Sequence, residues 1–369
     1  MLRSSRRQKV VGNDTCYGAQ PVRWLSEMSD RAGRTPQATL PTPFAGLTPD
    51  AVMDAAEALG LEPDGRQFAL NSYENRVYRV GRTDAAPVVI KFYRTGRWSD
   101  QQILEEHQFA LELAEQEIPV AAPMLLGGTT LHRHAGFRLA VFPLCAGTAP
   151  ELDRAGAREL LGRTLARIHA VGARQRFQFR LSLNREQWGV KARRGLMRSG
   201  FLPEHMQQRY DEVSALLLEK IEAAFENAAP VAMIRLHGDC HLGNILWQER
   251  GPLLVDLDDC LNGPRIQDLW MFLSGNTDEQ RRQWSEIMEG YGQFGVLDHS
   301  ELRLIEPLRA ARMLNHAAWI AERWLDPAFP RAFPWAGQVR FWEGYVGDLM
   351  QQCEVLDEPP QLTGALPEL

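Results

Sequence analysis

The sequence predicts an α+β protein with two lobes, a small β-rich N-terminal lobe and a larger helical C-terminal lobe. Short apolar or alternating runs crowd the first part of the chain, whereas long patterns of helical period dominate after residue 150. The 369 residues are enough for two cores, and a composition of 44% hydrophobic and 24% charged residues is ordinary for globular proteins. We place the N-lobe at 43–143 and the C-lobe at 144–358, between an N-terminal extension (1–42) and a tail (359–369).

Composition and charge exclude several classes of function. Residues 1–42 have a basic start and no clear period, so we expect a disordered extension or an upstream start codon chosen in error. They lack the apolar core of a secretory signal, and no apolar run approaches the ~20 residues of a membrane helix. A net charge of −6 argues against a general nucleic-acid binder. Five scattered cysteines favour a reducing compartment, and we expect a cytoplasmic protein.

The N-lobe elements follow from local signals. Thr48 is a cap for a short helix that ends at Gly60, and Ser99 is a cap for a longer helix at 99–117. β-rich runs bounded by turn residues predict strands at 66–70, 76–80, 88–92, 123–126 and 137–142. We expect the residues 132–136 to form a turn before the last of these strands.

Two neighbouring segments carry polar residues at spacings that suit phosphoryl transfer. Asp239 is followed five residues later by Asn244, and Asp256 ends the apolar run 253–255. Transfer from ATP needs a carboxylate that orients the acceptor hydroxyl, together with an amide and a carboxylate that hold Mg²⁺. We therefore predict Asp239 and Asp256 as catalytic residues, and Asn244 and Asp256 as metal ligands. The alternative is an ordinary polar turn before a buried strand.

Lys91 is a candidate ligand for the nucleotide phosphates. It lies inside the apolar run 88–92, where its ammonium group loses hydration unless a carboxylate or phosphate meets it. An edge-strand lysine facing water is the alternative. On the helix 99–117, Glu106 shares the apolar stripe and is the predicted carboxylate partner, whereas Glu105 falls on the polar face and is the runner-up.

Two further segments are predicted to contact the nucleotide. The turn 71–75 has no Gly-rich motif, but Ser72 can present its hydroxyl and neighbouring N–H groups to a phosphate; a plain hairpin turn has the same composition. After the strand 137–142 the chain enters a Pro/Gly segment, which we interpret as the hinge between the lobes. Phe142 and Leu144 are therefore predicted to lie beside the adenine.

The C-lobe is predicted to be mostly helical, with helices at 153–172, 203–227, 278–290, 301–323 and 338–352. Between the first two, the segment 174–198 holds eight Arg or Lys residues and one acid, Glu186; it fits either a site for an acidic or phosphorylated substrate or a solvated loop. Asp268 follows a Gly-Pro turn. We expect its carboxylate either to accept hydrogen bonds from the segment 236–247 that carries Asp239 and Asn244 (the catalytic loop), or to serve simply as a negative charge at a helix N-terminus.

These residues resemble kinases of the aminoglycoside phosphotransferase-like superfamily, and more narrowly a bacterial Ser/Thr protein kinase of the stress response. The similarity covers roughly 45–362. The matching segments are LNSYENRVY (70–78), KFYR (91–94), ILEEHQFAL (103–111), LHGDCHLGNILW (236–247), VDLDD (255–259), GPRIQDLW (263–270) and DPAFP (326–330).

The resemblance implies a protein-kinase-like fold of the aminoglycoside phosphotransferase type that uses ATP and Mg²⁺. It implies Asp239 as the proton acceptor, Asn244 and Asp256 as Mg²⁺ ligands, Ser72 as a nucleotide contact, and Lys91 with its Glu as an ion pair. The expected partners are protein substrates with Ser or Thr acceptors, for a protein that is monomeric and binds neither nucleic acid nor membrane. The nearest rival is a small-molecule kinase for aminoglycoside, choline or homoserine, which an acid-rich substrate pocket would favour. A nucleotide-binding regulator without transferase activity is the rival from another class.

Overall fold

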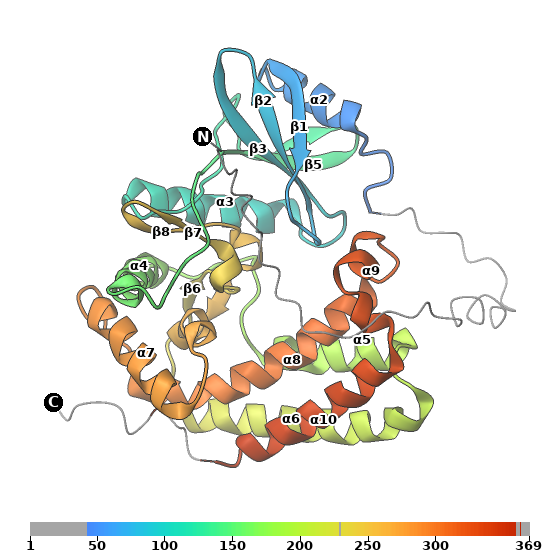
Figure 1. Ribbon diagram of the computed structural model, residues 1–369, viewed down its shortest axis with the longest axis vertical. Coiled ribbons are helices and arrows are strands. Elements are labelled where there is room, and N and C mark those ends of the chain that lie inside the picture. Colours follow the sequence, from blue (N-terminus) through green and yellow to red (C-terminus); the bar gives the residue numbers. More distant parts are fainter. Residues whose placement is uncertain (1–42, 229, 359–361, 363–369) are drawn as a thin grey trace, which may run out of the picture. The chain divides into compact units, whose positions relative to one another are not determined.

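The computed structural model describes residues 43–228, 230–358 and 362. Our expectations for 1–42 and for most of 359–369 lie outside these ranges. Over the described residues, a β-sheet with two helices forms the N-terminal region, and helices with two short two-stranded sheets form the rest (Figure 1). The predicted α+β class is therefore confirmed.

The N-terminal sheet has five antiparallel strands in the order β1-β2-β3-β5-β4. The central strand β3 carries Lys91, which lies opposite Val77 on one side and Ala140 on the other. The strands are β1 (Pro63–Ala69), β2 (Arg76–Arg82), β3 (Ala85–Tyr93), β4 (His132–His134) and β5 (Phe137–Pro143).

Two details of the predicted sheet were wrong. Residues 123–126 form no strand: the Met124 N–H donates to the Val141 carbonyl, Leu126 forms only an isolated bridge with Thr129, and Pro123 has no N–H to donate. The residues predicted as a turn at 132–136 instead include the strand β4. The turn is confined to Ala135 and Gly136, whose positive φ values of 47° and 83° are those of a tight two-residue hairpin turn.

Two helices accompany the sheet, and both predicted caps are confirmed. Helix α2 (Pro49–Ala58) begins at Thr48, whose side chain accepts the Ala51 N–H. Helix α3 (Asp100–Glu115) begins at Ser99, which forms a capping box with Gln102. The N-terminal core lies between α2 and the sheet; it contains Val52, Ala55, Val80, Val88, Ile90, Phe92, Leu139 and Val141.

The C-terminal region contains the predicted helices and two larger cores. One core lies mainly around α4 and α7, the other among α5, α6, α8 and α10 (Figure 1). The helices are α4 (Ala157–Gly172), α5 (Lys191–Ser199), α6 (Glu204–Ala228), α7 (Thr277–Tyr291), α8 (Ile305–Glu322), α9 (Ala328–Ala332) and α10 (Val339–Val355). Within the described ranges, no helix has the length and apolar character to cross a bilayer.

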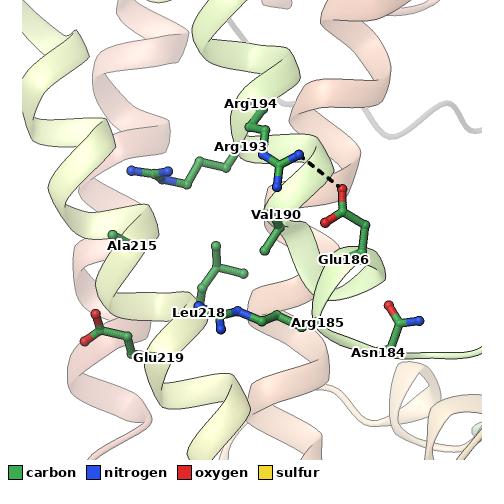
Figure 2. A pocket seen from close by; sticks show the side chains of 9 residues that line it. All are labelled: Asn184, Arg185, Glu186, Val190, Arg193, Arg194, Ala215, Leu218 and Glu219. Atoms are coloured by element: carbon green, nitrogen blue, oxygen red, sulfur yellow. Dashed lines mark ion pairs between the residues drawn. The ribbon is translucent and has the colours of Figure 1, made fainter.

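The basic segment 174–198 is only partly a solvated loop. Residues 174–184 are largely irregular and exposed, whereas the following residues form a helical turn (Glu186–Val190) and α5, and several of the cations have acidic partners. Arg193 pairs with Asp211, and Arg194 pairs with Glu186. Both arginines line a pocket of about 690 Å³ between α5 and α6, and Figure 2 shows the ion pair of Arg194 with Glu186. The pairing leaves little free positive charge for an acidic substrate there.

Close contact between α4 and α7 sets the geometry of the first C-terminal core. A Cβ on Gly290 of α7 would lie 1.8 Å from the Glu159 carbonyl, and a Cβ on Gly162 of α4 would lie 2.0 Å from the Ile287 carbonyl. Backbone meets backbone at both points, so neither position has room for a side chain.

We predict that Gly290→Ala destabilises the protein by about 1–3 kcal/mol, because the added methyl group forces α4 and α7 apart. The matched control is Gly344→Ala in α10, where nothing lies within 4 Å of the added carbon. That change stabilises by about 0.5–1 kcal/mol, since alanine favours a helix interior. Urea unfolding measures both. Equal effects of the two substitutions would contradict the close approach.

Candidate active site

Asn244 and Asp256 leave the same end of a β-hairpin. The strands β7 (Ile245–Gln248) and β8 (Gly251–Leu254) pair with Ile245 opposite Leu254, and the Val255 N–H donates to the Asn244 carbonyl at 3.0 Å. The Asn244 amide nitrogen donates to the Asp239 carbonyl at 2.9 Å, which turns one face of the amide toward the catalytic loop and leaves its oxygen as an acceptor. An amide oxygen and a carboxylate at one hairpin end are hard ligands, so this donor set fits Mg²⁺.

Asp256 adopts a backbone conformation that non-glycine residues rarely use. Its φ of 60° and ψ of 71° lie in the left-handed region. Such conformations cost free energy and concentrate at functional sites. Here the turn brings the half-exposed carboxylate to 2.9 Å from the Lys91 ammonium.

Lys91 is buried and lies among three carboxylates. Its Nζ is 2.9 Å from Asp256, 3.0 Å from Asp258 and 3.4 Å from Glu106. Burial opposes the charged ammonium group, but these carboxylates outweigh burial and hold the pKa of Lys91 well above its usual value. The water-facing edge-strand alternative is therefore wrong.

The structure places Glu106, and not Glu105, beside Lys91. Glu106 is also shared with Arg180, whose guanidinium lies 2.6 Å from its other oxygen. Glu105 instead accepts three backbone N–H groups, from residues 178, 179 and 180, at 2.6–2.8 Å. The polar face of α3 thus anchors the chain that carries Arg180, while the apolar face presents Glu106 to the site.

Asp239 is flanked by two basic side chains. Arg312 of α8 approaches one carboxylate oxygen at 2.5 Å, and His241 lies 3.4 Å from the other. Burial favours the neutral acid, yet the hydrogen bond from His241 and the charge of Arg312 together hold the pKa of Asp239 well below its usual value. Asp239 is therefore ionised at neutral pH.

The carboxylate of Asp268 anchors the backbone of the catalytic loop. Its carboxylate oxygens accept the N–H groups of His237 and Gly238, each at 2.8 Å, so the expected contact with the catalytic loop is confirmed. Gly238 has a φ of 86°, and a Cβ there would lie 2.2 Å from the Asp259 carbonyl. Only glycine fits at this point.

The other predicted nucleotide contacts surround this centre. Ser72 is half-buried in the loop between β1 and β2. Phe142 of β5 lies opposite Val89 of β3, and Leu144, just after β5, is exposed. Thr148 then pairs with Trp247 through two backbone bonds of 2.8 and 2.9 Å. The hinge segment therefore runs from the sheet to the hairpin that bears Asn244 and Asp256, although the nucleotide contacts themselves stay predictions.

Several charged residues of the site were missed by sequence reasoning. Arg180 and Arg312 come from regions without a motif, and only the fold brings them to Glu106 and Asp239. Arg97 pairs with both Asp258 and Asp259. The adjacent acids after the strand at 253–255 are visible in the sequence, and two neighbouring carboxylates are a signal that a cation must lie close by.

Comparison with known proteins agrees with this geometry. The model of the Phosphotransferase enzyme family matches residues 65–305, more than half of the chain. The chain therefore belongs to this family of phosphotransferases. This membership supports a kinase or phosphotransferase activity.

Individual relatives narrow the class further. The chain is 44% identical over 321 residues to Stress response kinase A of Escherichia coli O157:H7, covering 87% of this chain and 97% of that protein. It is 43% identical, with the same coverage, to Serine/threonine protein kinase RdoA of Salmonella typhimurium strain LT2. The solved structure of the amicoumacin kinase hAmiN with AMP-PNP and Ca²⁺ shares the fold, with a TM-score of 0.65 at 18% identity, covering 85% of this chain and 95% of that one.

We predict that Asp268→Asn destabilises the protein by about 1–3 kcal/mol, because one of two buried N–H groups then faces an amide NH₂ instead of an acceptor. Hydrogen exchange at the amides of His237 and Gly238 should accelerate as well. Asp298→Asn is the matched control: Asp298 accepts the Ser300 N–H near the surface, and asparagine caps equally well. Equal unfolding free energies for the two variants would count against this role of Asp268.

Proposed function

We propose that this protein is an ATP- and Mg²⁺-dependent kinase that phosphorylates Ser or Thr hydroxyls of proteins. The observation that carries the proposal is that Asn244 and Asp256 meet at one hairpin end, with the Asn244 amide bonded to the Asp239 carbonyl and Lys91 at 2.9 Å from Asp256. The names of the 43–44% identical relatives support a protein kinase of the stress response.

Asp239 is suited to hold the acceptor hydroxyl. Its carboxylate is ionised and accepts a hydrogen bond from the hydroxyl, which orients the oxygen for in-line attack. A carboxylate of low pKa is a weak base, so it takes up the proton late, as the bond to phosphorus forms. Mg²⁺-ATP, when bound, supplies the phosphoryl group and the metal charge that stabilises it.

The other predicted site residues would bind the metal and the negatively charged phosphates of the nucleotide. Asn244 and Asp256 would hold the metal through their side-chain oxygens, and Lys91 and Ser72 would hold the phosphates. In the free protein, Lys91 divides its charge among Asp256, Asp258 and Glu106. A bound nucleotide would present phosphate oxygens to this ammonium, which would leave the Asp256 carboxylate available to the metal. Phe142 and Leu144 would border the adenine at the hinge.

The charges around Asp239 favour a neutral or acidic acceptor over a cationic small molecule. Arg312 and His241 flank the carboxylate, and Arg312 is partly exposed. Burial, and then the charge of Arg312, lower the pKa of His316 one turn further along α8, so the positive charge at this point comes from the arginine. Asp258 and Asp259 are both paired with Arg97. An ammonium group beside the reacting hydroxyl would thus meet repulsion from Arg312.

The small-molecule kinase stays the second candidate. It uses the same residues, and the solved amicoumacin kinase shares this fold. The acceptor alone separates the two functions. Our proposal also includes a cytoplasmic protein that acts as a monomer.

We predict that Asp239→Ala binds nucleotide as the wild type does but loses phosphoryl transfer by about 10³-fold or more, since the acceptor hydroxyl is no longer oriented. The assay follows the γ-phosphoryl label from ATP onto casein, onto the enzyme itself, and onto a set of amino alcohols and aminoglycosides. Calorimetric titration with Mg²⁺-ADP verifies that the variant still binds.

Label on Ser or Thr that disappears with Asp239→Ala supports the protein kinase. Label on a small molecule alone transfers the function to the second candidate and leaves the site intact. Turnover at the wild-type rate in Asp239→Ala would refute the role of Asp239.

A further inference from the structure

Two segments that lie far apart in the sequence meet in the structure. One is the loop 71–75 between β1 and β2, which contains Ser72; the other follows α8 and begins at Asp326. Asp326 is 4% exposed, and its carboxylate binds two arginines: Arg76, the first residue of β2, at 2.7 Å, and Arg94, the residue after β3, at 2.6 Å. Arg76 and Asp326 are 250 residues apart in the sequence.

The two arginines hold the backbone of the loop. Arg94 donates from Nε to the Glu74 carbonyl at 2.9 Å and from Nη2 to the Tyr73 carbonyl at 3.3 Å. Arg76 donates to the carbonyls of Tyr73 and Asn75 at 3.1 and 3.0 Å. These loop carbonyls thus find side-chain donors, and Asp326 fixes the donors.

Glu74 provides a second attachment on α8 itself. Its carboxylate accepts the indole N–H of Trp319 at 2.6 Å and lies 2.5 Å from Nε of Arg323. Glu74 is 8% exposed, so this carboxylate is withdrawn from water and depends on these partners.

One face of α8 therefore serves both ends of the active site. Arg312 holds Asp239, and Trp319, seven residues later and hence on the same face, holds Glu74. At 1.5 Å per residue, the two contacts are roughly 10 Å apart along the helix. The loop that carries Ser72 and the loop that carries Asp239 are therefore both attached to the same helix, α8.

We propose that Asp326 and Trp319 are positioning residues that hold the 71–75 loop in the geometry that binds the nucleotide phosphates. They act through Arg76, Arg94 and Glu74. This inference rests on the proposed nucleotide-dependent function. The loop has no glycine-rich turn or helix N-terminus that would fix it locally, so the buried ion pairs of Asp326 with Arg76 and Arg94 take that role. A loop that is already fixed loses less conformational entropy when the nucleotide binds, so the affinity for the nucleotide is higher.

The test measures nucleotide binding directly, by calorimetry with Mg²⁺ and the non-hydrolysable analogue AMP-PNP, together with kcat and the KM for ATP. Asp326→Asn removes the charge but keeps an oxygen for the Ala328 N–H, which Asp326 accepts at 3.1 Å. We expect the Kd for AMP-PNP and the KM for ATP to rise about tenfold, with kcat within about threefold of wild type. Hydrogen exchange at the amides of 72–75 should accelerate, and Asp326→Glu should recover most of the affinity.

The matched control is Glu112→Gln, which removes another ion pair between α3 and the C-terminal region: Glu112 lies 2.7 Å from Arg235 and does not touch the loop. It should leave the Kd unchanged. Trp319→Phe is the second variant, because it keeps the aromatic packing and removes only the N–H donor to Glu74; it should raise the Kd about threefold.

An unchanged Kd in both Asp326→Asn and Trp319→Phe overturns the inference, and so does an equal loss in Glu112→Gln. If Asp326→Asn does not fold, Trp319→Phe decides alone. A wild-type protein that binds no AMP-PNP would instead remove the proposed function, and the inference with it. The two failures are therefore distinguishable.

Discussion

The buried ammonium group of Lys91 is the constraint on which the rest of the site depends. An isolated charge in the centre of a β-sheet is costly, so the protein must bring carboxylates to it from elsewhere. They come from α3, through Glu106, and from the segment after β8, through Asp256 and Asp258. Meeting this one requirement ties the N-terminal sheet to the hairpin that carries the predicted metal ligands.

The surplus of carboxylates around Lys91 is itself balanced by arginines. Arg180 takes the second oxygen of Glu106, and Arg97 takes Asp258 together with Asp259. Arg97 also lies 3.7 Å from Glu74, so the charge network continues from Asp258 and Asp259 to the loop 71–75 and, through Glu74, to Trp319 of α8. Removing one partner from such a network leaves another charge buried without compensation, so its members depend on one another.

Local patterns were sufficient where function depends on a short stretch of chain. Asp239, Asn244 and Asp256 fall within eighteen residues, and their spacing alone predicted one site; the capped helices α2 and α3 were equally visible from Thr48 and Ser99. Glu106 was found because a carboxylate interrupts an apolar stripe. The strand β4 was missed because three residues are too few to show a period, and its pairing is decided by the turn at 135–136.

Contacts between distant segments had no such signal. Nothing in the helical pattern of α8 marks Arg312 as the neighbour of Asp239, 73 residues earlier, or Trp319 as the neighbour of Glu74, 245 residues earlier. The basic segment 174–198 shows the converse: eight cations in sequence suggested an open patch, but folding pairs several of them with acids on other elements. A run of basic residues in a sequence therefore predicts a basic binding surface only when the acidic residues that pair with it in the fold are known.

The central claim is that Asn244, Asp256 and Lys91 form one site for metal and nucleotide phosphates. A crystal structure with Mn²⁺ and AMP-PNP tests it most directly, because the anomalous signal of manganese locates the metal independently of the protein. We expect the ion to be bound by the Asn244 amide oxygen and the Asp256 carboxylate, with the Lys91 ammonium on a phosphate oxygen. Manganese bound elsewhere, or a nucleotide that leaves Lys91 without a phosphate contact, would contradict the account.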